Sequence, residues 1–123
     1  MADWRVIREA ASGKVVLARA RWCSGFWCHF RGLMLRRSLL EDEGLFFVYR
    51  KESVTQVTIH MFFVFFAIAA VWLDAEGRVV DAKLARPWRP YYAPAGPAQY
   101  LIEARPSLLE RVKIGERLTF EKA

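Results

Sequence analysis

The chain has 123 residues, of which 54% are hydrophobic and 26% charged, which excludes a disordered chain and leaves no room for a second core. We therefore expect a single domain over residues 1–123. The formal net charge of +6 excludes a strongly acidic protein. The N-terminus shows no apolar segment of a secretory signal, so we expect a cytoplasmic protein. Asn is absent and Arg outnumbers Lys, a composition typical of thermophiles.

The first third of the chain predicts two strands and a short helix. Residues 4–8 are a candidate strand, and residues 14–22 alternate in character as a half-buried strand does. Residues 24–31 can form two helical turns that end at Gly32, and residues 33–40 can add another turn.

A continuous apolar run, Met61–Leu73, raises the question of a membrane span. Its thirteen residues fall short of the about 18 that a bilayer requires. The run is rich in Phe and Val, which favours strands, so we expect buried strands at residues 57–64 and 68–74, after a shorter strand at 45–49. The sequence therefore predicts no membrane partner.

The last third of the chain predicts a hairpin, a loop and two further strands. Asp74–Gly77 is a hairpin signal, and the prolines and aromatic residues that begin at residue 85 indicate a loop. Strands are expected at residues 98–104 and 117–121, with a short helical piece that begins at Pro106. About eight short strands and one or two short helices predict a mainly β fold, a small jelly-roll-like sandwich or barrel.

A series of short motifs also follows one order along the chain. They are Gly32-Leu33-Met34, Arg36, Leu39, Glu43-Gly44 before Leu45-Phe46-Phe47-Val48, Met61, Leu73-Asp74-Ala75-Glu76-Gly77-Arg78-Val79-Val80, Tyr100-Leu101-Ile102-Glu103 and Gly115-Glu116-Arg117. In this order and spacing they resemble the family called domain of unknown function 192, over roughly residues 14–121.

The resemblance implies a mainly β, jelly-roll-like fold with short helices on one side, and no known activity. It also implies polar residues after Met61, in a Lys-Asn pattern, and a Pro and an Asp a few positions later. This chain has Phe62-Phe63 and Ala67-Ile68-Ala69 there instead. We therefore assign no functional residue from that stretch.

Cys23 and Cys28, together with His29 and His60, could form a metal site, but the four-residue gap between the cysteines is wider than in most zinc pairs. On one helix the two sulfurs would point apart, whereas in a loop a metal site or a disulfide becomes possible. We expect inert free thiols, no metal and no cofactor.

No catalytic constellation is recognisable, so the sequence inclines against an enzyme without deciding the question. The serines lie in no nucleophile motif, and a packing role is expected for His60. The acidic run Glu41–Glu43 is expected to be a solvated turn that partners Arg36 and Arg37. A pocket with two convergent titratable groups would favour an enzyme again.

Two segments are candidate binding surfaces. The first is the loop of residues 85–94, where aromatic and Arg side chains could bind a small molecule, a glycan or a protein; its candidates are Arg86, Trp88, Arg89, Tyr91 and Tyr92. The second is an acid-free stretch that could bind nucleic acid; its candidates are Lys14, Arg19, Arg21, Arg31, Arg36 and Arg37. We favour a non-catalytic binding or accessory domain that uses the loop, with nucleic-acid binding and an unrecognised enzyme as alternatives.

Overall fold

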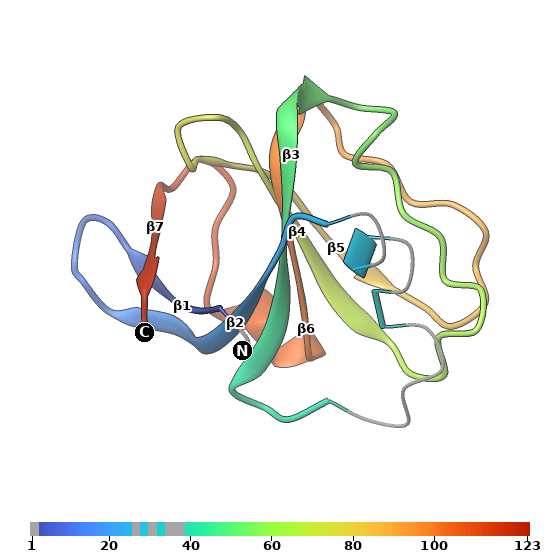
Figure 1. Ribbon diagram of the computed structural model, residues 1–123, viewed down its shortest axis with the longest axis horizontal. Coiled ribbons are helices and arrows are strands. Elements are labelled where there is room, and N and C mark those ends of the chain that lie inside the picture. Colours follow the sequence, from blue (N-terminus) through green and yellow to red (C-terminus); the bar gives the residue numbers. More distant parts are fainter. Residues whose placement is uncertain (1–2, 26–27, 30–31, 34–38) are drawn as a thin grey trace.

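The computed structural model confirms a mainly β fold (Figure 1). It describes residues 3–25, 28–29, 32–33 and 39–123. The strands in this part of the chain are β1 (Trp4–Glu9), β2 (Val15–Cys23), β3 (Glu43–Ser53), β4 (Ile68–Leu73), β5 (Val79–Ala85), β6 (Ala98–Ala104) and β7 (Leu118–Lys122). A short 3-10 helix, η1 (Pro106–Glu110), begins at the proline that predicted it.

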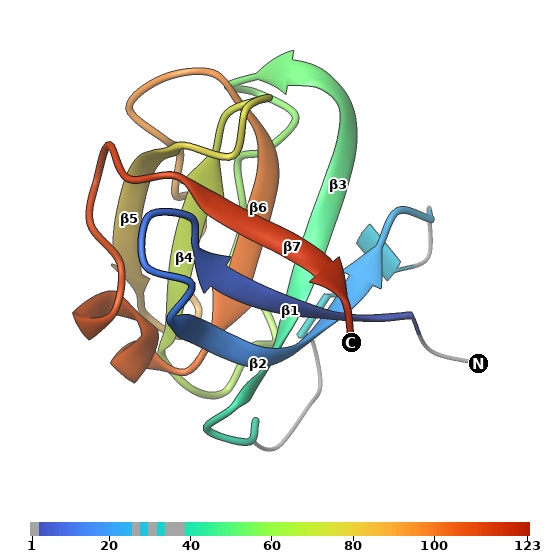
Figure 2. The same ribbon diagram turned by 90° about the vertical axis from the view of Figure 1, so that its left-hand side faces the viewer.

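The strands form one sheet in the order β5-β4-β6-β3-β2-β1-β7. All neighbours are antiparallel except β2 and β3, which run parallel. The sheet curls until its two edges approach: Leu118 N donates to Gly77 O at 2.9 Å, and Val79 N donates to Glu116 O at 2.9 Å. Figure 2 shows β7, β1 and β2 crossing in front of the other strands. Of the two expected shapes, the barrel-like one is observed.

Strand β4 is buried on both faces, which explains its unbroken apolar sequence. Ala69, Val71 and Leu73 point into the core enclosed by the curled sheet. Ile68 and Trp72 point to the other side and pack in a second core on the outer face of β3, β6 and β4. A strand between two cores needs apolar side chains at every position.

The second core is covered by two irregular segments, residues 57–66 and 86–97, here called the outer cover. The expected strand at 57–64 is wrong: its one ladder contact is an isolated bridge between Ile59 and Tyr92. Trp72 lies beneath it and donates its indole N–H to Val57 O at 2.8 Å. Both segments run along the same side of the molecule (Figure 1).

The remaining expected elements have mixed outcomes. The hairpin between β4 and β5 is confirmed, with Gly77 at a φ of 84°. In the expected helix at 24–31, Cys28 and His29 are helical, and the expected turn at 33–40 lies mostly outside the described residues. No helix in the described ranges is long and apolar enough to cross a bilayer.

Candidate functional site

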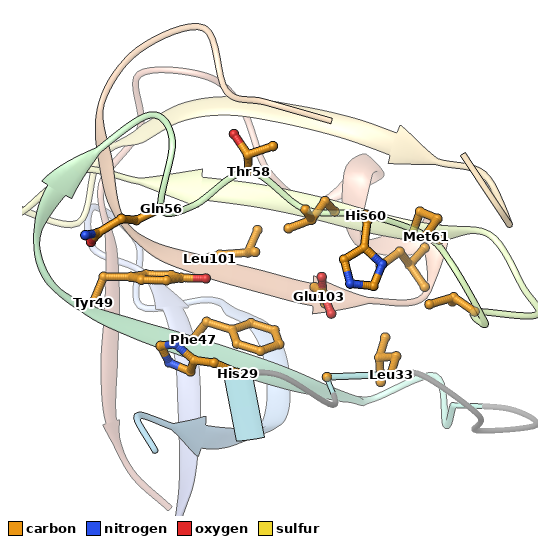
Figure 3. A pocket seen from close by; sticks show the side chains of 14 residues that line it. His29, Leu33, Phe47, Tyr49, Gln56, Thr58, His60, Met61, Leu101 and Glu103 are labelled. Atoms are coloured by element: carbon orange, nitrogen blue, oxygen red, sulfur yellow. The ribbon is translucent and has the colours of Figure 1, made fainter. Parts of the chain in front are cut away.

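A cleft of about 310 Å³ lies between the outer face of the sheet and the outer cover (Figure 3). Its floor is formed by Phe47, Leu101 and Glu103 on neighbouring strands β3 and β6. Residues of the 57–66 segment, among them Met61, form the opposite wall. The cleft is therefore mostly apolar, with few polar groups, as small-molecule sites usually are.

Glu103 is the charged residue at the centre of the cleft. It follows Leu101 on the same face of β6, while Ile102 and Ala104 point into the enclosed core. Its side chain is only 7% exposed and accepts no hydrogen bond from any described residue. Burial raises the pKa of the Glu103 carboxyl to about 8, because an ionised carboxylate is poorly solvated there.

Tyr49 is the other group of the cleft lining whose pKa is shifted. Figure 3 shows its hydroxyl pointing into the cleft toward Glu103. Burial, and then the nearby Glu103 charge, raise the pKa of Tyr49 far above its usual value. At neutral pH the tyrosine is therefore a neutral hydrogen-bonding group, and Glu103 is mostly protonated.

Of the other polar side chains around the cleft, those of His29, Thr58 and His60 make hydrogen bonds, whereas the Gln56 amide has no partner among the described residues. His29 Nε2 lies 2.7 Å from Cys23 O, and the His29 ring contacts those of Phe47 and Tyr49. The Thr58 hydroxyl donates to Val54 O at 2.8 Å. His60, across from Glu103 in Figure 3, accepts a hydrogen bond on Nδ1 from the Phe62 amide.

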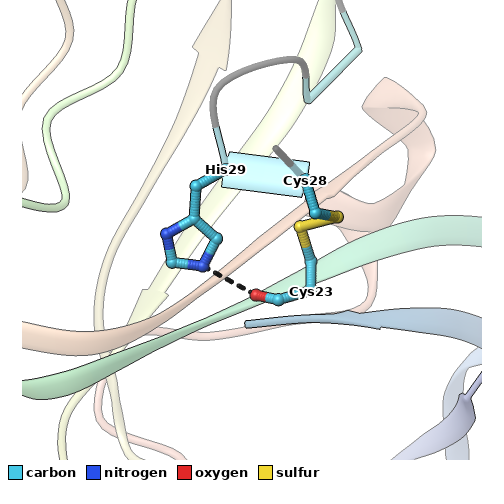
Figure 4. The surroundings of a disulfide bond; sticks show 3 residues. All are labelled: Cys23, Cys28 and His29. Carbon is cyan, nitrogen blue, oxygen red and sulfur yellow. Dashed lines mark hydrogen bonds between the residues drawn. A yellow bond between two sulfur atoms is a disulfide. The ribbon is translucent and has the colours of Figure 1, made fainter. Parts of the chain in front are cut away.

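The two cysteines form a disulfide, so the expectation of free thiols is wrong (Figure 4). Cys23 ends strand β2, the chain turns at Ser24 and Gly25, and Cys28 lies in the helical turn that follows. The pair is therefore not on one helix, and its Cα atoms are 5.6 Å apart, within disulfide range. The bond ties the turn that carries His29, a residue of the cleft wall, to the sheet.

The loop candidates lie outside the cleft, because the side chains that line it come from other segments. Trp88 and Tyr91 are exposed, as are Arg86 and Arg89. Tyr92 is half-buried, and its hydroxyl accepts a hydrogen bond from the Arg86 amide at 2.9 Å. The three rings are thus not all buried, and the hypothesis that this loop contacts a partner stays a prediction.

The basic candidates are described only in part. Lys14, Arg19 and Arg21 are exposed on and beside β2, and the Arg19 guanidinium lies 4.2 Å from the centre of the Trp4 ring. The other three, Arg31, Arg36 and Arg37, lie outside the described residues. Nucleic-acid binding by this stretch stays a prediction.

Two acidic clusters have local explanations. Glu41 pairs with Arg105 at 2.7 Å and accepts a hydrogen bond from Ser107; its expected partners Arg36 and Arg37 lie outside the described residues. The carboxylates of Glu52, Asp74 and Glu76 lie within 4.8 Å of one another. Asp74 and Glu52 accept hydrogen bonds from backbone amides of the β4–β5 turn. These contacts account for Glu41, Glu52 and Asp74 without a ligand.

Sequence reasoning missed Glu103 as a functional residue. The available signal was one carboxyl on a strand, residues 98–104, whose other side chains are small, apolar or aromatic apart from Gln99. A charge in such a strand indicates either an edge position or a site. The structure places β6 in the middle of the sheet, which leaves the second explanation.

Comparison with known proteins adds a family. The DUF192 family model, described as "Uncharacterized ACR, COG1430", matches residues 7–120. A UPF0127 protein of Thermococcus sibiricus is 37% identical over 111 residues, covering 89% of this chain and 70% of that protein. A UPF0127 protein of Pyrococcus furiosus is 31% identical over 116 residues, covering 93% of this chain and 97% of that protein.

Two solved structures share the fold at low identity. One, from Sinorhizobium meliloti 1021 and provisionally assigned as a transcription regulator, has a TM-score of 0.82 at 19% identity, covering 98% of this chain and 94% of that chain. Another, of unknown function from Novosphingobium aromaticivorans, has a TM-score of 0.79 at 19% identity, covering 96% of this chain and 84% of that chain. The match of the family model and the identity to the curated relatives lead to one conclusion: the chain belongs to the DUF192 family of uncharacterised proteins.

Proposed function

We propose that this protein is a non-catalytic binding domain for a small organic amine, held in the cleft with its ammonium group on Glu103. The observation that carries the proposal is the Glu103 carboxyl, buried in an apolar cleft without a hydrogen-bond partner among the described residues. The Glu103 oxygens are accessible from the cleft, and a bound ligand would supply the partner that the described protein groups do not.

The chemistry of the cleft favours a cationic ligand. No Lys or Arg lines the described part of it, so the carboxylate has no positive partner from the protein there. An ammonium group would supply the missing charge, and Tyr49 could accept a second hydrogen bond from it. Phe47, Met61 and Leu101 would contact the apolar body of the ligand. The cleft volume of about 310 Å³ suits a small organic molecule with a single ring.

Binding is better supported than catalysis, although the cleft is lined by four titratable groups, Glu103, Tyr49, His29 and His60. Glu103 and Tyr49 are both proton donors near neutral pH, and neither is paired with a base. No Ser or Cys lines the described cleft, and the Thr58 hydroxyl is already bonded to Val54 O. A nucleophile and a general base within reach of each other are therefore not observed in the described residues.

The test is titration of the protein with cyclohexylamine, followed by NMR or calorimetry, with cyclohexanol as the uncharged analogue. We expect cyclohexylamine to bind more tightly, and Glu103→Gln to lower its affinity at least about tenfold, the typical value of a charged hydrogen bond. Glu110→Gln, an exposed carboxyl elsewhere, is the matched control.

The pH dependence of the affinity separates the amine from a neutral ligand. An amine requires an ionised Glu103, so its affinity should rise by up to about tenfold per pH unit from pH 6 toward 8. If cyclohexanol binds as tightly as the amine, and Glu103→Gln binds both unchanged, the ligand class is wrong. If neither binds, small-ligand binding at this cleft is wrong.

A further inference from the structure

The outer cover carries a group of exposed aromatic rings that do not line the cleft. They are Phe62, Phe63, Phe65, Trp88 and Tyr91, here called the aromatic tip, and they are between 43% and 66% exposed. Large apolar side chains gathered at one exposed place usually mark an interaction surface.

The two segments of the aromatic tip are fastened together. Trp88 N donates to Met61 O at 2.8 Å, and Met61 N donates to Arg89 O at 2.8 Å. The Trp88 ring contacts Phe63 at 5.1 Å and Phe65 at 6.0 Å between centroids. Phe63 and Phe65 therefore gather around Trp88, although Phe63 and Trp88 are 25 positions apart in the sequence.

Backbone conformation holds two of these rings outward. Phe63 has a φ of 59° and Trp88 a φ of 65°, and no other described residue except glycine has a positive φ. A left-handed conformation is unfavourable for bulky side chains and persists where the surrounding structure enforces it. Both rings nevertheless remain 48% exposed, so burial of these side chains does not compensate for the unfavourable backbone conformation.

The charge around the aromatic tip is positive. No acidic residue occurs between Glu52 and Asp74 or between Asp81 and Glu103, the two stretches that include the outer cover. Arg86 and Arg89 are exposed there and form no ion pair with any described residue. A partner that complements this surface is apolar and anionic.

We propose that the aromatic tip docks on the surface of an anionic lipid bilayer, with its rings at the headgroup level and Arg86 and Arg89 on lipid phosphates. Trp and Tyr favour this interface, and basic residues add electrostatic attraction to anionic lipids. The short apolar run led us to expect no membrane partner, but peripheral docking requires no membrane-spanning segment. This inference is independent of the amine proposed for the cleft.

Other partners fit the tip less well. Its ring pairs are tilted at 60° and 51°, so they leave no parallel gap for a nucleic-acid base. Two copies of the chain that met through the tip would bring Arg86 and Arg89 of one copy against those of the other. Like charges facing each other oppose such a contact.

The experiment is co-sedimentation of the full chain with vesicles of phosphatidylcholine alone and of phosphatidylcholine mixed with phosphatidylglycerol. Phe63→Gly/Trp88→Gly removes two rings where glycine accepts the positive φ, so the backbone conformation is kept. We expect the wild type to bind the mixed vesicles, and this variant to bind at least about tenfold more weakly.

A second pair of variants tests the charges. Arg86→Gln/Arg89→Gln should weaken binding to the mixed vesicles about tenfold, because each basic side chain near the surface contributes. Lys51→Gln/Lys113→Gln makes the same change in net charge at exposed positions outside the outer cover and should bind as the wild type does. Glu103→Gln should also bind vesicles normally, which separates this proposal from the one for the cleft.

Three results would overturn the proposal. The first is a wild type that does not sediment with the mixed vesicles, and the second is a glycine double variant that binds them as well as the wild type. The third is a concentration-dependent dimer that the glycine double variant abolishes while vesicle binding is absent, which would assign the aromatic tip to a second copy of the chain.

Discussion

At the scale of single residues, Glu103 links the stability of the fold to pH. Its pKa is about 8 in the folded chain and near 4.5 when exposed, so the folded state binds an extra proton between these values. The stabilisation from this proton is complete below about pH 4.5 and is lost as pH rises through 8. The loss is at most about 1.4 kcal/mol per pH unit.

We therefore predict that Glu103→Gln removes this pH dependence. Urea unfolding of the wild type should show the free energy of unfolding falling between pH 5 and pH 8, whereas the variant should lack that part of the fall. A glutamine cannot ionise, so the variant should be the more stable protein at pH 8. Parallel curves for the two proteins would show that Glu103 is solvated and ionised in the folded state.

The residue scale is also where the sequence was least informative. Whether Cys23 and Cys28 could meet depended on where the helical turn begins, and a shift of a few residues decides between free thiols and a disulfide. The role of Glu103 depended on which strands flank β6, which no local pattern reveals. Both are consequences of long-range placement and not of composition.

At the scale of elements, Gly44 controls how closely β3 approaches β6. A Cβ atom built on Gly44 would lie 2.5 Å from the backbone oxygen of Glu103 and 2.9 Å from Leu17 Cδ2. Backbone cannot yield as the end of a flexible side chain can, so the two strands would have to separate. The floor of the cleft, where Glu103 lies, would move with them.

We predict that Gly44→Ala lowers the free energy of unfolding by about 2–3 kcal/mol, the upper range for overpacking of a core. Gly96→Ala is the matched control, because nothing lies within 4 Å of a Cβ at that position. Chemical denaturation of the two variants against the wild type measures the difference. Equal stability of both variants would show that β3 and β6 can separate at little cost.

Elements with a strong local pattern could be predicted from the sequence. The segment that covers the second core could not. The alternation at 14–22, the hairpin at 74–77 and Pro106 each marked an observed element. The apolar segment 57–64 was mistaken for a strand because a covering segment and a buried strand share the same composition. Its exposed Phe62 and Phe63, adjacent in sequence, do not alternate as strand residues do.

At the scale of the whole molecule, the curled sheet and the outer cover are held by different interactions. The sheet encloses one core and is paired almost continuously from β5 to β7. The outer cover is held by the isolated bridge, the Met61 contacts and the Trp72 indole, together with packing on the second core. The strand order of the sheet includes a parallel pair, β2 and β3. No local sequence pattern predicts that these two strands lie side by side.

We predict that the outer cover opens without unfolding of the sheet. The amides of Ile59, Met61 and Trp88, which bond within the cover, should exchange hydrogen with a lower free energy of opening than that of Val71 in β4. Hydrogen exchange followed by NMR at low urea concentrations measures both, because local opening is nearly independent of urea whereas global unfolding is not. Cyclohexylamine should slow exchange in the cover and, because global unfolding also releases the ligand, at Val71 as well. If the cover amides exchange only through global unfolding, the cover and the sheet form one cooperative unit, and access to the cleft requires no opening of this kind.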